Sequence, residues 1–258
     1  MAYSTNPIIS GGGPSSQSIY TVTDSPRHQI GTRAILPDGR VFYYSCNRTA
    51  AILAAGKLTK ANEISIDFDD LATNTAAVGD TVVNVTPVGS ATYAENELAG
   101  GYLSINSGTT GLGTQYRISH HAATSGATAF DLYLSDPIRV AFNADTTATV
   151  VPNPWSDCVI TDANETQFVN GCPPVAVAAG SDSAPQFFWN QTWGTATVLA
   201  NVGATVAIGQ ALQVCSSNTA GSFEAATEGA GTLNQVIGVA LFTGVAGDYM
   251  PVFLQIAP

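Results

Sequence analysis

Residues 31–47, GTRAILPDGRVFYYSCN, decide the fold class because they have the pattern of a β-hairpin. Two runs rich in β-branched and aromatic residues, 33–36 and 41–47, flank a Pro-Asp-Gly turn at 37–39. Proline presets the backbone of such a turn, and glycine takes the positive φ that other residues resist. We therefore predict an antiparallel strand pair in which Gly39 has a positive φ.

The same strand pattern continues along the chain at intervals of about 10 to 20 residues, with Gly, Asn, Ser, Thr and Pro between the runs. This spacing is typical of an antiparallel sandwich or barrel and not of a parallel α/β sheet. Helix is expected only over about 50–55, in an apolar run that fits a buried strand equally well. The further runs are 64–68, 81–87, 101–106, 115–119, 130–135, 138–142, 186–200, 210–214, 236–241 and 250–257.

Composition divides the chain into an arm and two β modules. Residues 1–26 are small and polar, contain a glycine triplet and three prolines, and predict an extended arm that gains order on a partner. Residues 27–60 and 185–258 are expected to pack beside each other as one β module, with a strand-rich module, 61–184, inserted between them. The predicted fold class is all-β, with antiparallel sandwich- or barrel-like modules and an extended N-terminal arm.

Charge is distributed unevenly. The chain has 8 Lys and Arg against 19 Asp and Glu, a net charge of −11. Within 27–60 the one acid is Asp38, so this segment is basic while the remainder is strongly acidic. A basic segment on an acidic body favours docking on an acidic partner, although a solvated surface gives the same composition. The candidate docking residues are Arg27, Arg33, Arg40, Arg48, Lys57 and Lys60.

Several classes of partner and compartment are disfavoured. A basic segment this small does not make a nucleic-acid footprint, and no stretch has the length of about 18 apolar residues that a membrane span needs. Nothing after Met1 resembles a signal peptide, so we expect synthesis in a cytoplasm. Four scattered cysteines then predict free buried thiols, with Cys158 and Cys172 the one pair close enough to bridge.

Motifs for catalysis, metal binding and cofactor binding are weak, and we predict none of the three. His120 and His121 are adjacent and would face opposite sides of a strand. No GxSxG elbow marks a nucleophile. The closely spaced acids lack the glutamate that completes a calcium loop, and as a glycosidase pair they compete with ordinary water-facing carboxylates. These acids are Asp67, Asp69 and Asp70, and Glu95 and Glu97 with Asp131 or Asp136.

Four aromatic residues stand close together in one predicted strand. They are Phe187, Phe188, Trp189 and Trp193. Aromatic rings in such a group either pack in a core or subunit interface or form a platform on which a sugar stacks. We predict packing, and the platform remains the alternative.

Four stretches resemble virion structural proteins of tailed bacteriophages, and most of all capsid decoration, or cement, proteins. They are GTRAILPDGRVFYYSCNRTAAILAAGKL (31–58), GGYLSINSGTTGLGTQYRISHHAATSG (100–126), FFWNQTWGTATVL (187–199) and VIGVALFTGVAGDYMPVFLQI (236–256). The last stretch is similar to the small β module of decoration proteins that trimerise on the outer capsid. The chain is longer than simple cement proteins and carries an inserted middle.

The resemblance implies a function in particle assembly. It implies a non-enzymatic protein on the outer capsid surface of the virion, which binds the major capsid protein and stabilises the shell by bridging capsomers. A homo-oligomer, with a trimer favoured, would join several weak contacts into one strong attachment. The alternative is a receptor- or glycan-binding module of a head fibre or tail with Trp189 and Trp193 as its platform, and a secreted hydrolase or adhesin is the third hypothesis.

Overall fold

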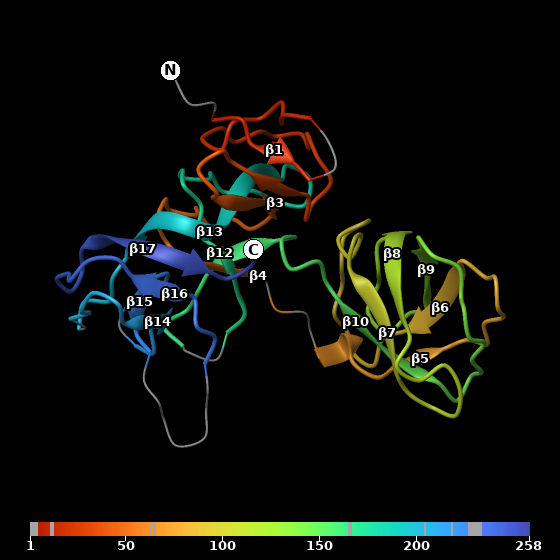
Figure 1. Ribbon diagram of the computed structural model, residues 1–258. Helices are drawn as coiled ribbons and strands as arrows, with labels where there is room; N and C mark the ends of the chain where they lie inside the picture. Colours follow the sequence, from red (N-terminus) through yellow and green to blue (C-terminus); the bar gives the residue numbers. More distant parts are fainter. Residues whose placement is uncertain are drawn as a thin grey trace. The chain divides into compact units, whose positions relative to one another are not determined.

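The computed structural model describes residues 5–10, 13–61, 63, 66–164, 167–203, 205–217, 219–226 and 234–258 (Figure 1). It divides into two compact units, the first made of Met1–Asn62 with Pro154–Pro258 and the second of Glu63–Asn153. In the described residues the secondary structure is β except for one 3-10 turn, η1 (Ile66–Phe68), which confirms the predicted all-β class. None of the described helices is long and apolar enough to cross a membrane.

The first unit is built on an eight-stranded antiparallel sheet with the order β1-β2-β3-β13-β17-β16-β14-β15. Its strands are β1 (Ile8–Ile9), β2 (Arg33–Ile35), β3 (Val41–Asn47), β13 (Gln186–Leu199), β14 (Ala211–Val214), β15 (Phe223–Ala225), β16 (Gly238–Ala240) and β17 (Tyr249–Gln255). Strands β2 and β3 form the hairpin that the sequence predicts.

Strand β13 organises this sheet. Its first part pairs with β3, from Gln186↔Asn47 to Trp193↔Val41, and its second part pairs with β17, from Trp193↔Gln255 to Leu199↔Tyr249. The register shifts between Gln191 and Trp193, where the strand has a bulge. One apolar core, which includes Phe42, Tyr44 and Trp189, packs on the first part, and a second, which includes Val198, Val252 and Leu254, packs on the second part. One strand of 14 residues thus connects two cores.

The hairpin turn has the predicted geometry. The φ of Gly39 is 84°. Its N–H donates to the Leu36 carbonyl at 2.9 Å, and the Leu36 N–H donates to the Arg40 carbonyl at 2.9 Å. A Cβ at Gly39 would meet no atom within 4 Å, so the turn requires glycine for its backbone conformation alone.

The described part of residues 1–26 packs on the first unit. Ile8 pairs with Ile35, and the fully buried Ile19 belongs to the same core as Trp189. The Trp189 indole Nε1 donates to the Gln17 carbonyl at 3.1 Å, and this buried hydrogen bond holds the N-terminal segment against the core. Residues 1–4 and 11–12 of the predicted arm, including two of the three triplet glycines, lie outside the described residues.

Two expected elements differ from the structure. The run 50–55 is not helical, because Leu53 is buried and exchanges two backbone hydrogen bonds with Val177, of 3.0 and 2.8 Å. The local pattern allowed either a helix or a buried strand, and the pairing of Leu53 with Val177 gives the extended backbone. In the expected strand 138–142 only Phe142 pairs, through an isolated bridge to Ala76. Of the expected strand 64–68, the last three residues form η1 and the first two lie outside the described residues.

The second unit is a closed antiparallel barrel with the order β10-β5-β6-β9-β8-β7. Burial alternates strictly along β9, where Phe130, Leu132 and Leu134 point into the core, and the alternation breaks in β8, where the register shifts between Ile118 and His120. The barrel interior is filled by apolar side chains, among them Tyr116 and Phe142. Its strands are β5 (Leu71–Thr73), β6 (Val82–Thr86), β7 (Tyr102–Ser107), β8 (Gln115–His121), β9 (Phe130–Leu134) and β10 (Thr147–Val151).

The barrel is inserted between two paired strands of the first unit. A small sheet with the order β11-β4-β12 joins β4 (Thr59–Ala61), β11 (Cys158–Ile160) and β12 (Val169–Gly171). Ala61 pairs directly with Cys158, so the chain leaves the first unit and returns to it on neighbouring strands. Residues 154–184, which the sequence grouped with the inserted module, belong to the first unit because they pair with β4, Leu53 and Gln191.

The turn predicts the effect of one substitution. Gly39→Val should lower the free energy of unfolding by about 1–3 kcal/mol, because a β-branched residue is strained at positive φ. Gly39→Asn should cost less, since asparagine tolerates this conformation. Gly13→Val is the matched control, because Gly13 has equally open space and no positive φ. Urea denaturation measures all three, and equal stability of Gly39→Val and Gly13→Val would show that the turn is not strained.

The insertion predicts that the first unit folds without the barrel. Replacing residues 63–153 by a short Gly-Ser turn should leave the β4–β11 pairing intact, because closing a short loop costs little entropy. The shortened protein should be soluble, show a β circular dichroism spectrum and unfold in one cooperative transition. An aggregated or non-cooperative product would show instead that the first unit depends on the barrel.

Candidate functional site

The six basic residues of the predicted docking segment do not lie together. Arg40 and Arg48 flank opposite ends of β3, which at about 3.3 Å per residue places their backbones roughly 25 Å apart. Arg33 is on β2 and Lys60 on β4, while Arg27 and Lys57 lie in loops. An extended backbone thus separates charges that are close in sequence.

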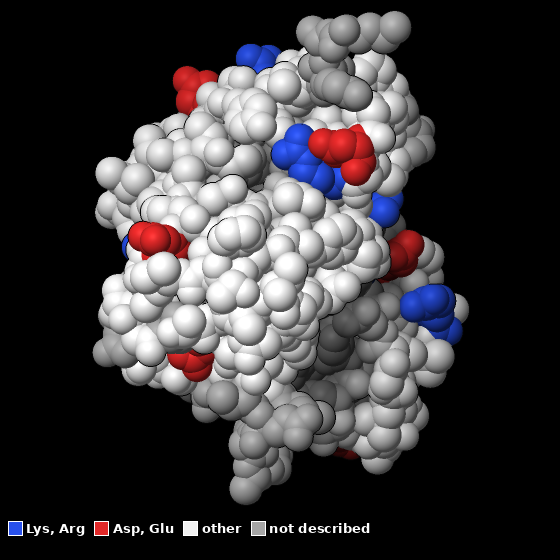
Figure 2. Space-filling model, turned by 60° about the vertical axis from the view of Figure 1, so that its left-hand side comes forward, with Lys and Arg blue, Asp and Glu red and all other residues white. Residues whose placement is uncertain are grey.

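Several of these cations have partners within the chain. Arg40 Nε donates to Asp38 Oδ2 at 2.8 Å, and the buried Lys60 Nζ contacts Asp162 Oδ2 at 2.7 Å. Arg33 Nε donates to the Pro258 carbonyl at 2.8 Å. In Figure 2 the Lys and Arg side chains form separate spots on a mostly uncharged surface, and one lies directly against an acidic side chain. The six residues therefore do not form one basic face.

Three of the four aromatic residues are core residues. Phe187, Phe188 and Trp189 are buried, because β13 is covered on both faces along its first part. Trp193 is half-buried, and its ring packs edge-on against Phe253 with centroids 5.7 Å apart. The predicted packing is confirmed for the first three residues, and Trp193 alone remains at the surface.

A groove lies along the second part of β13 in the first unit. Its cavity has a volume of about 320 Å³, within the usual range for ligand sites, and its lining includes Tyr20, Arg40, Gly56, Thr195, Thr197 and Tyr249. We call this site the β13 groove. A neighbouring hollow of about 460 Å³ shares Arg40 and Thr195 and adds Trp193 and Phe253. Sequence reasoning pointed to Arg40 and Trp193 but missed Tyr20, Thr195 and Thr197, which carry no motif.

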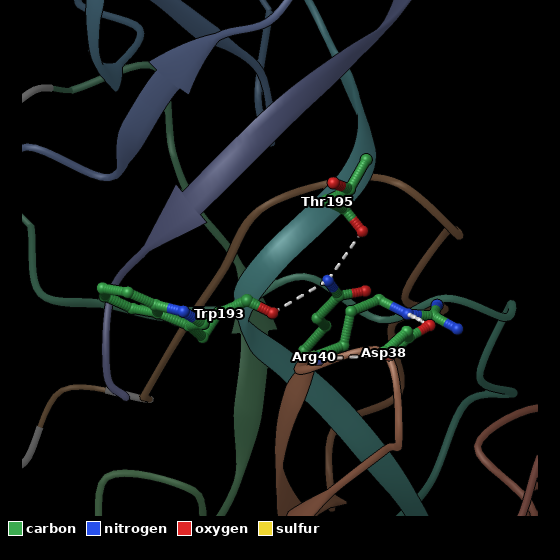
Figure 3. A network of polar contacts seen from close by, with 5 residues as sticks. Asp38, Arg40, Trp193 and Thr195 are labelled. Carbon is green, nitrogen blue, oxygen red and sulfur yellow. Dashed lines mark hydrogen bonds and ion pairs between the residues drawn. The ribbon is translucent and has the colours of Figure 1, made fainter.

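The bulge in β13 shapes this groove (Figure 3). The Gln191 side chain reaches along its own strand, and its Nε2 donates to the carbonyls of Trp193 at 3.1 Å and Thr195 at 2.9 Å. Gly194 has φ 88°, and a Cβ there would lie 2.9 Å from Arg40 Cγ. Glycine at this position therefore lets Arg40 pack on the backbone of β13.

The charge of the β13 groove comes from a single side chain. Arg40 is the one charged residue that lines the β13 groove, whereas Asp38 joins Arg40 in the lining of the neighbouring hollow. Of the five guanidinium N–H groups of Arg40, the Nε–H pairs with Asp38. The guanidinium carbon lies 5.8 Å from the centroid of the Phe42 ring. The two terminal nitrogens have no hydrogen-bond acceptor among the described residues, so Arg40 can still donate to an anionic group.

The cysteines are not a reactive site. All four are free and buried, which confirms the prediction of free thiols and leaves Cys158 and Cys172 unbridged. Burial raises the pKa of Cys46 to about 11 and the pKa values of Cys158 and Cys172 to about 12. These thiols stay protonated at neutral pH, and the protonated form is a poor nucleophile.

The barrel acids act as local hydrogen-bond acceptors. Asp67 Oδ2 accepts the Ala91 N–H at 2.9 Å, and Asp70 Oδ1 accepts Asn106 Nδ2 at 2.7 Å. Glu97 Oε2 accepts the Ala94 N–H at 2.8 Å. Within the described part of the chain, no three His, Cys, Asp or Glu residues are grouped so that they could hold a metal ion.

Comparison with protein-family models, curated proteins and solved structures finds no match to this chain.

His121 is a buried titratable residue of the barrel, and its environment requires it to be neutral. His121 Nε2 accepts the Leu98 N–H at 2.9 Å, and Nδ1 lies 2.6 Å from the Ala122 carbonyl, which can only accept. The two main-chain partners therefore fix the tautomer with its proton on Nδ1. Burial lowers the pKa of His121 below its ordinary value of 6.5.

His121 predicts loss of stability in acid. Because its folded pKa is lowered, the unfolded chain binds more protons near pH 6, so its contribution is complete above about pH 6.5 and is lost as pH falls through the folded pKa. His121→Gln should flatten the dependence of the melting temperature on pH between about 7 and 5. An unchanged slope in His121→Gln would contradict the assignment.

Proposed function

We propose that this chain is a capsid decoration protein, which binds the major capsid protein on the outer surface of a bacteriophage particle and stabilises the shell by bridging capsomers. The observation that carries the proposal is an exposed apolar patch on two connected loops of the first unit. We call it the loop patch, and it comprises Val202, Ile208, Leu241, Phe242 and Val245.

The loops that carry the patch are held in place by backbone pairing. Val206 and Gly244 form a bridge, and the Gly244 N–H donates to the Val206 carbonyl at 3.1 Å. The Ala200 N–H donates to the Asp248 carbonyl at 2.8 Å, which ties the bases of the loops together. The patch therefore has a defined shape before any partner binds, which lowers the entropy cost of association.

The composition of the patch suits burial against another protein. Phe242 is 63% exposed and Val245 is 68% exposed. Asp248 is the one charged residue in the sequence of the two loops, 200–210 and 241–248. Each large apolar side chain that becomes fully buried contributes about 1.5–3 kcal/mol, so a few such residues can hold an assembly together. Either the capsid surface or neighbouring copies in a trimer would bury them.

The folded N-terminal segment changes which part of the chain is expected to make the attachment. Because Ile19 and Gln17 belong to the first unit, removing residues 1–26 would expose Trp189 and damage the fold. A deletion of the arm is therefore a poor probe of attachment. The exposed loop patch offers a cleaner one.

A second function has one specific observation in its favour. Trp193 lies at the surface beside Phe253 and the Arg40–Asp38 ion pair, a combination of aromatic ring and polar groups that binds sugars. This arrangement supports the alternative of a receptor- or glycan-binding virion module. Loss of binding to a glycan array in Trp193→Ala, with capsid attachment unchanged, would favour it.

The decoration proposal predicts the behaviour of a patch variant. Phe242→Ser combined with Val245→Ser should leave the fold intact and reduce attachment to undecorated capsids at least tenfold, about 1.4 kcal/mol. Co-sedimentation with capsids assembled from the major capsid protein of the same genome measures attachment, and light scattering after gel filtration measures the oligomer. Ile52→Ser is the matched control, because Ile52 is 65% exposed and lies outside the two loops.

The role of charge is tested in the same assay. Neutralising Arg27, Arg33, Arg48 and Lys57 should weaken attachment less than the patch variant, and the parent should lose only part of its attachment between low salt and about 0.5 M salt. Full attachment of the patch variant at every salt concentration would contradict the decoration proposal in this form.

A further inference from the structure

One edge of β13 is unpaired where the strand lines the β13 groove. Strand β3 pairs with β13 only as far as Trp193, whereas β17 continues on the opposite edge to Leu199. In the described part of the chain, no strand pairs with Thr195 or Thr197 on the β3 side. The sheet thus has a short gap beside its longest strand.

The backbone groups in this gap point into the groove. The Leu199 N–H donates to the Gly56 carbonyl at 2.9 Å, on the edge away from β17. Backbone groups of an antiparallel strand alternate between its two edges, so those of Thr195 and Thr197 point the same way as Leu199. The Thr195 carbonyl accepts from Gln191, which leaves the N–H groups of both threonines and the Thr197 carbonyl facing the cavity.

The gap is closed at both ends. Arg40 packs against Gly194 at one end, and Gly56 lies close to the Thr197 carbonyl at the other. The Gly56 N–H donates to the Pro173 carbonyl at 2.9 Å, which fixes this wall. An unprotected strand edge invites aggregation, and walls of this kind limit the edge to one short extended segment.

The positive charge of Arg40 indicates which side chain a bound segment would carry. Arg40 is the one charged group that lines the cavity, and its terminal guanidinium nitrogens are available to an anion. A carboxylate on an extended segment could accept two hydrogen bonds from them, whereas a lysine would meet a like charge. The half-exposed rings of Tyr20 and Tyr249 offer apolar contact on the flanks.

We propose that the β13 groove binds an extended, carboxylate-bearing peptide segment of a partner protein, which adds one strand to the edge of β13 at Thr195–Thr197 and places its carboxylate on Arg40. The biological meaning of this inference rests on the proposed attachment function, in which the segment would belong to the capsid protein. Peptide binding itself can be measured without capsids.

The test titrates the full chain with a seven-residue peptide of alternating valine and threonine that has glutamate at its centre. Nuclear magnetic resonance should show shifts of the Thr195 and Thr197 amides and slower exchange of their hydrogens, with a dissociation constant of about 1 mM or lower. The same peptide with N-methylated backbone amides should not bind, and a central lysine should weaken binding severalfold.

Three variants distinguish the contribution of the β13 backbone to peptide binding from the contribution of the groove side chains. Thr197→Pro removes only the N–H that faces the groove, since a proline is tolerated where a strand edge is unpaired, and it should abolish binding. Thr197→Val retains the N–H and should bind like the parent. Arg40→Gln should remove the preference for glutamate over lysine. Thermal melting of each variant shows that the fold is kept.

Two results would overturn the inference. One is the absence of any shift at the two threonine amides with the glutamate peptide at about ten times the expected dissociation constant. The other is equal binding by Thr197→Pro and Thr197→Val. Peptide binding without capsid attachment would refute only the decoration function, and capsid attachment without peptide binding would refute only the groove.

Discussion

The backbone pairing of β13 is the constraint on which the first unit depends. A single strand of 14 residues forms hydrogen bonds with β3 along its first part and with β17 along its second, so the two apolar cores are fixed to one element. The bulge between Gln191 and Trp193 lies where β13 changes its partner strand from β3 to β17. It exposes Trp193, admits Arg40 over Gly194 and creates the groove, so the candidate site is a direct consequence of the pairing.

Local signals made part of the fold predictable. The turn at Gly39 and the strict alternation of β9 depend on residues that are neighbours in sequence, and both have the expected form. The run around Leu53 depends on Val177, and the strands β11 and β12 of the segment 154–184 depend on β4, which are all partners distant in sequence. The residue pattern of a short segment cannot predict such pairing, because the strand is stabilised by contacts with residues outside the segment.

The candidate site was less predictable than the fold. The basic residues are close in sequence, but strand geometry separates Arg40 from Arg48, and Lys60 finds its counter-ion at Asp162. Among the aromatic residues, alternation alone could not distinguish Trp189 from Trp193, since both faces of β13 are covered at the first and only one at the second. The groove threonines gave no signal at all, because their role depends on where β3 ends.

Because the barrel is inserted between paired strands, one chain contains two units that each have their own apolar core. Pairing of Ala61 with Cys158 brings the two ends of the inserted unit to neighbouring strands, so the first unit tolerates the insertion without loss of a core contact. The barrel has its own closed ladder of hydrogen bonds and its own core around Tyr116 and Phe142. The loop patch and the β13 groove are built from other strands, which belong to the first unit, so their shape depends on the pairing of β13 and not on the barrel ladder.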